Sequence, residues 1–453
     1  MPEYPGSPGS QRLSGVVRKA PNRIAAAVLG SLGGGVVPRV GLEYITVGRG
    51  AEIAALLRDM ELVAGGGASF RFIVGRYGAG KSFLLQTIRN HVMEKRFAVL
   101  DCDLSPERRF CGTRGQGLAA YRELVRNMSV RARPEGGALP LVLEKWLSGV
   151  QSEVIAEGVS ADSPGFDAEV QKKIHSVIHA MEDMVNGFDF GLALGKYWQA
   201  GRAGDDEGKA KVLRWLRGEY TTKTEARQAL GVGSIVTDDN WYDYLKLFSA
   251  FLVRAGYAGM VIMIDELVNL YRIPHRVTRQ YNYEKMLAMY NDALQGKAKH
   301  IAILMCATPQ CLEDPDKGIF SYDALRSRLA EGRFSAPGAR DLLAPVLRLE
   351  PLTYEEMMVL TEKLAALHAG LYEYECAIAP EEYLAFLKAE FGRVGAGTHI
   401  TPREVIRDFV ELLNLLYQNP GKKIGDVLAE GGAFGAAGPG EEGVGAEYAG
   451  FEV

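Results

Sequence analysis

The chain has 453 residues, of which 47% are hydrophobic and 24% charged, and a formal net charge of −4. This is the composition of a soluble globular protein with room for two or three domains, and it excludes a global basic field that would attract nucleic acid. Five cysteines without C-x-x-C spacing exclude a disulfide framework and favour a reduced, cytoplasmic setting. No apolar run is long enough to cross a bilayer, so we expect no membrane partner.

In chain order, the sequence predicts four regions. Residues 1–37 form an N-terminal arm rich in Pro, Gly and Ser, followed by a short helix. Residues 38–345 form an α/β core that opens with a short strand after Gly41. Residues 346–428 have an all-helical pattern. Residues 429–453 are Gly-rich and acidic, and we expect them to be disordered.

Four apolar runs in the core predict buried strands: Phe70 to Val74, Phe97 to Leu100, Met260 to Ile264 and Ile301 to Met305. Helical patterns separate them, and this alternation favours a parallel sheet with helical crossovers. Residues from about 115 to 245 are mostly helical in pattern. They therefore predict a large helical insertion between the second and third of these strands.

A glycine-rich loop follows the first predicted strand and matches G-x-x-x-x-G-K-[ST], the Walker A pattern. Its glycines let backbone N–H groups surround phosphates, Lys81 reaches the β- and γ-phosphates, and the Ser82 hydroxyl ligates Mg²⁺. The helix that begins after this loop points the positive N-terminal end of its dipole at the phosphates. The chain lacks the Asn-Lys-x-Asp motif that selects guanine. We therefore predict ATP and Mg²⁺ as cofactors, bound by Gly75, Arg76, Tyr77, Gly78, Ala79, Gly80, Lys81, Ser82 and Phe83.

Two acids end the strand Met260 to Ile264, in the manner of a Walker B motif. A parallel strand delivers such groups to its carboxyl end, where α/β sheets bind ligands. Asp265 would hold Mg²⁺ through water, and Glu266 would orient and deprotonate the attacking water. The alternative is a core strand that ends in an acidic turn. The P-loop in the same chain favours catalysis.

Three more residues have candidate roles in catalysis or nucleotide sensing. Thr308 follows the strand Ile301 to Met305 and could hydrogen-bond the attacking water or the γ-phosphate, although it could also be a plain strand terminator before Pro309. Arg328 is the candidate arginine finger for a neighbouring subunit, with Arg326 as the alternative. Arg403 lies in the first turn of a helix capped by Thr401 and could report on the nucleotide, with Arg407 one turn on as the alternative.

This ordered set of motifs resembles the AAA+ ATPase family. The resemblance covers residues 38–428 apart from the insertion. It implies an α/β fold, namely a P-loop AAA+ core with a parallel sheet, a large helical insertion and a C-terminal helical lid. In family order, the matching residues are Gly48 and Arg49 at the nucleotide, the P-loop, the acid pair, the sensor Thr308, the finger Arg328 and the lid arginine Arg403.

Within AAA+, the arrangement is similar to the origin-recognition clade, and more narrowly to the ATP-binding protein of BREX phage-defence systems. The segments that carry this likeness are Val36–Gly41, Ile45–Arg49, Arg71–Ser82 and Asp101–Ser105. The resemblance implies a cytoplasmic, homo-oligomeric ATPase that works with a helicase or another defence protein. Two alternatives stay open. One is a nucleotide-gated assembly scaffold with slow hydrolysis, and the other is a helicase loader or initiator.

The stretch from Tyr271 to Tyr281 is the candidate nucleic-acid contact. It mixes cations with aromatic rings, which contact phosphates and stack on bases. The predicted contact residues are Arg272, Arg276 and Arg279. A solvated helix and loop is the alternative.

Overall fold

The computed structural model describes residues 19–179, 181, 183–332, 340–392 and 401–430. These residues divide into two units. The sheet unit spans Arg49–Glu350, and the helical unit combines the chain up to Gly48 with the chain from Pro351 onward. The predicted arm before residue 19 and the predicted tail after residue 430 lie outside the described residues.

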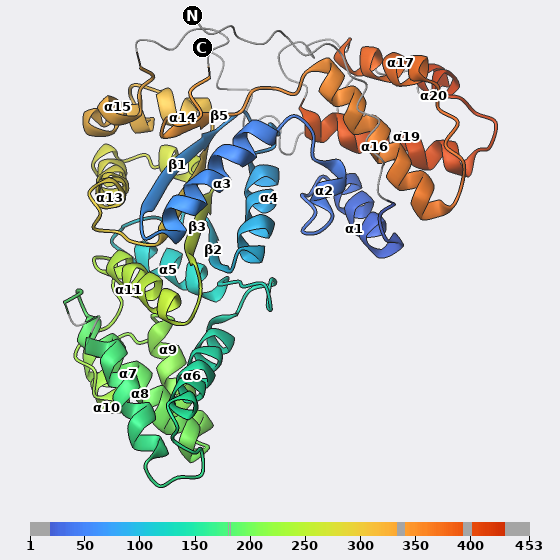
Figure 1. Ribbon diagram of the computed structural model, residues 1–453. Helices are drawn as coiled ribbons and strands as arrows, with labels where there is room; N and C mark the ends of the chain where they lie inside the picture. Colours follow the sequence, from blue (N-terminus) through green and yellow to red (C-terminus); the bar gives the residue numbers. More distant parts are fainter. Residues whose placement is uncertain (1–18, 180, 182, 333–339, 393–400, 431–453) are drawn as a thin grey trace, which may run out of the picture. The chain divides into compact units, whose positions relative to one another are not determined.

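The sheet unit contains a five-stranded sheet in the order β2-β3-β4-β1-β5, and all its pairings are parallel (Figure 1). This confirms the predicted α/β class, with strands at the four predicted apolar runs. Most residues of the four long strands are buried, as expected where helices cover both faces of a parallel sheet. The strands are β1 Ala68–Val74, β2 Phe97–Asp103, β3 Gly259–Asp265, β4 Ile301–Ala307 and β5 Val346–Arg348.

Helices cover both faces of the sheet, and strand residues alternate between two hydrophobic clusters. On one face, Ile73 and Val261 pack with side chains of α3 and α4. On the other, Phe72 and Ile262 pack with side chains of α5, α11 and α13. The two layers fix the positions of the strand ends. The covering helices are α3 Gly50–Ala64, α4 Lys81–Glu94, α5 Gln116–Arg126, α11 Trp241–Arg254 and α13 Arg276–Leu294.

Between β2 and β3 the described chain is helical, as the pattern of residues 115–245 predicts. The helices share one hydrophobic cluster with the sheet, so the insertion is continuous with the core. Aromatic rings join its parts: Phe190 meets Phe248 at 5.3 Å, and Trp215 meets Tyr244 at 5.6 Å between centroids. Besides α5 and α11, its helices are α6 Leu139–Ala156, α7 Phe166–His179, α8 Gly187–Ala203, α9 Asp206–Leu216 and α10 Lys223–Leu230.

Short helical segments follow the carboxyl ends of β3 and β4. They turn the chain away from the sheet within a few residues of the strand end. Polar residues at these strand ends therefore stay at the sheet edge. The segments are α12 Val268–Tyr271, α14 Pro309–Glu313, the 3₁₀ turn Ile319–Ser321 and α15 Asp323–Leu329.

In the helical unit, an N-terminal helix packs against two helices from the other end of the chain: α1 contacts α16 and α19. The predicted capping box is present, since the Glu404 carboxylate accepts from the Thr401 N–H at 2.9 Å. The prediction of a short strand after Gly41 is wrong. A four-residue helix stands there because Leu42 and Ile45, three residues apart, are both buried. The helices are α1 Asn22–Gly33, α2 Leu42–Ile45, α16 Tyr354–Tyr372, α17 Pro380–Phe391, α19 Pro402–Gln418 and α20 Ile424–Glu430.

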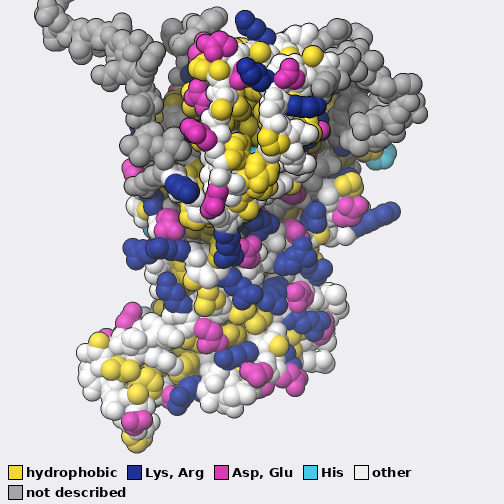
Figure 2. Space-filling view, turned by 90° about the vertical axis from the view of Figure 1, so that its right-hand side faces the viewer, with side chains coloured by type: hydrophobic (Ala, Val, Ile, Leu, Met, Phe, Trp, Pro, Cys, Tyr) yellow, Lys and Arg dark blue, Asp and Glu magenta, His cyan; other side chains and the backbone are white. Residues whose placement is uncertain are grey.

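The surface mixes charged and hydrophobic side chains. Figure 2 shows Lys and Arg side chains gathered across the middle of one face, with Asp and Glu scattered among them. The net charge of −4 is therefore unevenly distributed. Among the described helices, none combines the length and the apolar composition that a membrane span requires.

Candidate functional site

The carboxyl edge of the sheet collects the predicted site residues of the sheet unit. The P-loop follows β1, Asp265 ends β3 and Thr308 follows β4. Neighbouring strands end in register, with Val74 of β1 opposite Ala307 of β4. Because the strands are parallel, these groups share one edge although they are far apart in the chain.

Two glycines of the P-loop adopt left-handed backbone conformations, with φ of 73° at Gly78 and 91° at Gly80. These conformations let the backbone turn sharply. The Gly75 N–H donates to the Ala307 carbonyl at 3.1 Å, which ties the loop to β4. The Lys81 ammonium donates to the Gly75 and Arg76 carbonyls, both at 2.9 Å. Its side chain therefore lies against the loop that would surround a phosphate chain.

The two predicted metal ligands meet directly. The Ser82 hydroxyl donates to Oδ2 of Asp265 at 2.8 Å, although the residues are 183 positions apart. The other oxygen, Oδ1, accepts from the Glu266 N–H at 2.8 Å, and this bond fixes the carboxylate plane. A hydroxyl and a carboxylate side by side are the hard oxygen donors that Mg²⁺ takes. The donor set fits that ion.

Three carboxylates crowd together at this edge, and one of them was not predicted. Asp103 ends β2 directly opposite Asp265 in the register. The pKa of Glu266 is raised, mainly by desolvation and secondly by the negative charges of Asp265 and Asp103. Glu266 also has a positive backbone φ of 60°. Desolvation and Asp265 also raise the pKa of Asp103. A cation held by Ser82 and Asp265 would offset this repulsion and lower both pKa values. The sequence signal for Asp103 was its place as the polar end of an apolar strand.

Thr308 lies at the same edge and caps a helix. Its hydroxyl oxygen accepts from the Cys311 N–H at 3.2 Å, as the N-cap of α14. A threonine hydroxyl accepts one bond and still donates its own proton. Capping is therefore compatible with the predicted bond to water or phosphate, which stays a prediction.

The two finger candidates differ in their contacts on α15. Arg326 forms an ion pair with Asp323 at 2.8 Å. Arg328 is exposed, and its Nη1 donates to the Ala324 carbonyl of its own helix at 2.6 Å. A hydrogen bond within one exposed helical turn is easily exchanged for a phosphate partner. The Arg326 ion pair is also exposed and weak, so the preference for Arg328 stays a prediction.

Arg49 and Gly48 fall in different units. Arg49 is 6% exposed, and its Nη2 donates to the carbonyl of the P-loop residue Ala79 at 3.2 Å. Gly48 belongs to the helical unit, where a Cβ would come within 2.5 Å of the Glu356 carboxylate. Its backbone φ of 66° favours glycine at this position, and its contact with nucleotide stays a prediction.

The predicted lid arginines also belong to the helical unit. Arg403 is partly exposed in the first turn of α19, as predicted from the cap at Thr401. Arg407 pairs with Asp408 at 3.2 Å. The role of either residue at the nucleotide stays a prediction.

One of the three arginines predicted to contact nucleic acid is buried in the structure. Arg272 and Arg276 are exposed. Arg279 is 4% exposed, and it donates to the carbonyls of Ile273 at 2.6 Å and Asp316 at 3.2 Å. These bonds hold α13 to the loops beside it. Arg279 is therefore a structural residue and does not belong to the contact surface, because a phosphate cannot reach it.

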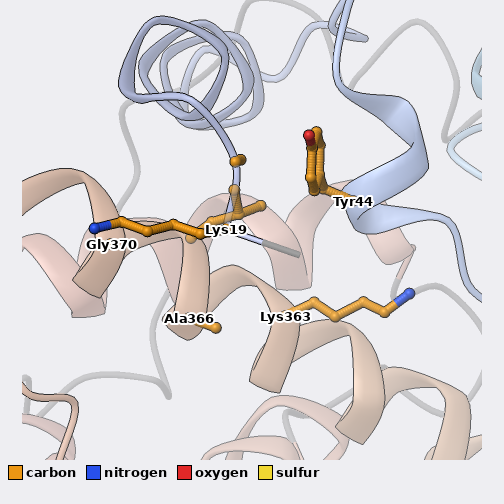
Figure 3. Close-up of a pocket in the computed structure, with 7 residues that line it drawn as sticks. Lys19, Tyr44, Lys363, Ala366 and Gly370 are labelled. Carbon is orange, nitrogen blue, oxygen red and sulfur yellow. The ribbon is translucent and has the colours of Figure 1, made fainter. Parts of the chain in front are cut away.

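The helical unit contains a small pocket lined in part by Lys19, Tyr44 and Lys363. Figure 3 shows the ammonium groups of the two lysines at opposite sides of the view. Lys363 donates to the Thr46 carbonyl at 2.8 Å, and desolvation lowers its pKa. The two cations therefore do not converge on one anion, unlike the groups at the sheet edge.

The parallel sheet carries a glycine loop with Lys81 after one strand and a carboxylate that contacts Ser82 at the end of another. This arrangement is typical of P-loop nucleotide-binding proteins. The chain belongs to the family described as BREX system ATP-binding protein BrxC/D, whose profile matches residues 20–431. It is thus an ATP-binding protein of a BREX defence system. No curated protein matches the chain significantly.

Proposed function

We propose that this protein is an AAA+ ATPase that hydrolyses ATP with Mg²⁺ and thereby drives or gates a BREX complex acting on DNA. The observation that carries the proposal is the 2.8 Å hydrogen bond between Ser82 and Asp265, with Lys81 and Glu266 adjacent to them in sequence. This contact supports the proposal, because phosphoryl transfer to water needs a phosphate-binding loop and an acid pair close to one another.

Each residue at the edge has a distinct task in this proposal. Lys81 releases the Gly75 and Arg76 carbonyls and holds the terminal phosphates. Ser82 and Asp265 would hold Mg²⁺, and the ion would supply positive charge against the negative charge of the phosphates. Glu266 would take a proton from the attacking water, since a carboxylate at this edge can act as a general base. Thr308 donates its hydroxyl proton to that water or to the γ-phosphate.

We further propose that the ATPase works as a homo-oligomer with ATP at subunit interfaces. Arg328 would then act on the nucleotide of the neighbouring subunit, and Arg403 would report the nucleotide state. The exposure of Arg328 on α15 supports this arrangement, because a finger must be able to leave its own subunit.

Replacing Lys81 by Ala tests whether the P-loop binds ATP. The variant should bind ATP at least about 100-fold more weakly, because two charge-assisted contacts with phosphate are lost. Calorimetric titration measures this affinity directly. Lys285→Ala, which removes a lysine outside the site, should leave it unchanged. Affinity close to wild type in Lys81→Ala would refute the site, and no Mg²⁺-dependent turnover by the wild type would refute hydrolysis.

DNA contact is proposed for the exposed arginines Arg272 and Arg276. Neutralising both should weaken binding to all sequences alike and reduce the salt slope by about one unit per lost phosphate contact. Fluorescence-anisotropy titrations over a series of salt concentrations give the slope. Arg227→Ala, an exposed arginine of α10, is the matched control. An unchanged slope in the double variant would place the contact elsewhere.

A further inference from the structure

Glu52, on α3, is a buried carboxylate beside the P-loop. Its side chain is 1% exposed, and burial of a carboxylate is costly unless cations pair with it. Its Oε1 lies 2.7 Å from Nη2 of Arg340 and 3.5 Å from Nη1 of Arg49. Two arginines therefore hold one carboxylate, and that carboxylate in turn fixes the orientation of both.

Arg49 passes this orientation on to the P-loop. A guanidinium is planar, so the ion pair between Nη1 and Glu52 also restrains the direction of Nη2. Nη2 donates to the Ala79 carbonyl at 3.2 Å and to the Glu350 carbonyl at 2.9 Å. Both hydrogen bonds of Nη2 to the backbone are thus oriented by the side chain of Glu52.

The hydrogen bond to Ala79 also directs the next N–H group. The peptide unit between Ala79 and Gly80 is planar and trans, so its carbonyl and its N–H point in opposite directions. With the carbonyl turned toward Arg49, the Gly80 N–H points away from Arg49. Gly80 accepts this geometry at φ of 91° because it has no side chain.

We propose that Glu52 is a positioning residue for nucleotide binding. Through Arg49 it holds the Ala79–Gly80 peptide so that the Gly80 N–H donates to a phosphate of ATP. Arg340 secures the carboxylate and also donates to the Arg348 carbonyl at 3.0 Å, which ties the end of β5 to the same group. The inference rests on the proposed P-loop site, but it assigns no contact with nucleotide to Glu52 itself.

The test is ATP affinity measured by calorimetry for Glu52→Gln, which keeps the shape of the side chain and removes its charge. Affinity should fall about 10- to 100-fold, as expected for one lost hydrogen bond to a charged group. The kcat at saturating ATP should stay within about twofold of wild type, because Asp265 and Glu266 keep their places. KM therefore changes and kcat does not.

Asp59→Asn is the matched control. Asp59 lies on the same helix and pairs with Arg71 at 2.6 Å, both side chains being mostly buried, without a bond to the P-loop. Both variants should lower the melting temperature, but only Glu52→Gln should weaken ATP binding. Equal loss of affinity in the two variants, or wild-type affinity in Glu52→Gln, would overturn the positioning role.

Two further variants keep the test decisive if Glu52→Gln does not fold. Arg340→Gln removes the 2.7 Å partner from a partly exposed position and should weaken ATP binding several-fold. The single variant Arg49→Ala and the double variant Arg49→Ala with Glu52→Gln should bind ATP with the same affinity. Both residues act through the one hydrogen bond from Arg49 to Ala79. Additive losses would overturn the inference. Failure of the wild type to bind ATP would instead refute the proposed function from which it starts.

Discussion

Replacing Glu266 by Gln should lower ATP turnover by about 10²- to 10⁴-fold while ATP stays bound. The amide keeps the size of the side chain but cannot take a proton from water. Binding should be retained or tightened, because removing one of three crowded negative charges favours an anion at this edge. Steady-state phosphate release gives the turnover, and calorimetry gives the affinity.

The control for this variant is Glu284→Gln, an exposed glutamate on α13 that is not among the carboxylates at the sheet edge. It should turn over ATP at the wild-type rate. If Glu266→Gln also keeps the wild-type rate, Glu266 is not the base. Wild-type protein that binds ATP tightly but turns over slowly, with no stimulation by DNA, would favour the nucleotide-gated scaffold.

Replacing Arg328 by Ala should spare ATP binding and lower turnover by about 10³-fold or more, because a finger stabilises charge only in the transition state. Stability should change little, since Arg328 is exposed and donates to the Ala324 carbonyl of its own helix. Turnover at saturating ATP measures the effect. Arg326→Ala, on the same helix, is the matched control and should have a much smaller effect if Arg328 is the finger.

A mixing experiment shows whether Arg328 acts on the neighbouring subunit. Inactive Arg328→Ala and inactive Glu266→Gln are combined and allowed to exchange subunits. Some interfaces then pair an intact Glu266 with an intact Arg328, so partial activity should return. A residue acting within its own subunit cannot be rescued in this way. Mixtures that exchange subunits and stay inactive would count against Arg328, and Arg326 would be the next candidate.

The sequence by itself determined the elements whose local pattern is strong. Apolar runs predicted the four long strands because a strand buried on both faces needs little polar surface. The glycines and Lys81 predicted the P-loop because phosphate binding demands that spacing. The cap at Thr401 predicted the start of α19, since its hydrogen bonds join residues three apart. The segment after Gly41 was misassigned because four residues carry too little periodicity to separate helix from strand.

Only the tertiary structure decided which distant residues share an environment. Strand order and register set Asp103 beside Asp265, and no local pattern specifies which strands pair. Packing buried Arg279, although its sequence neighbourhood is that of an exposed cationic helix. Packing likewise placed Arg340 next to Glu52, although the two residues are 288 positions apart in the sequence. Burial, pairing and pKa shifts arise from contacts across the chain, so the sequence supplies the groups while the fold decides which of them act on one another.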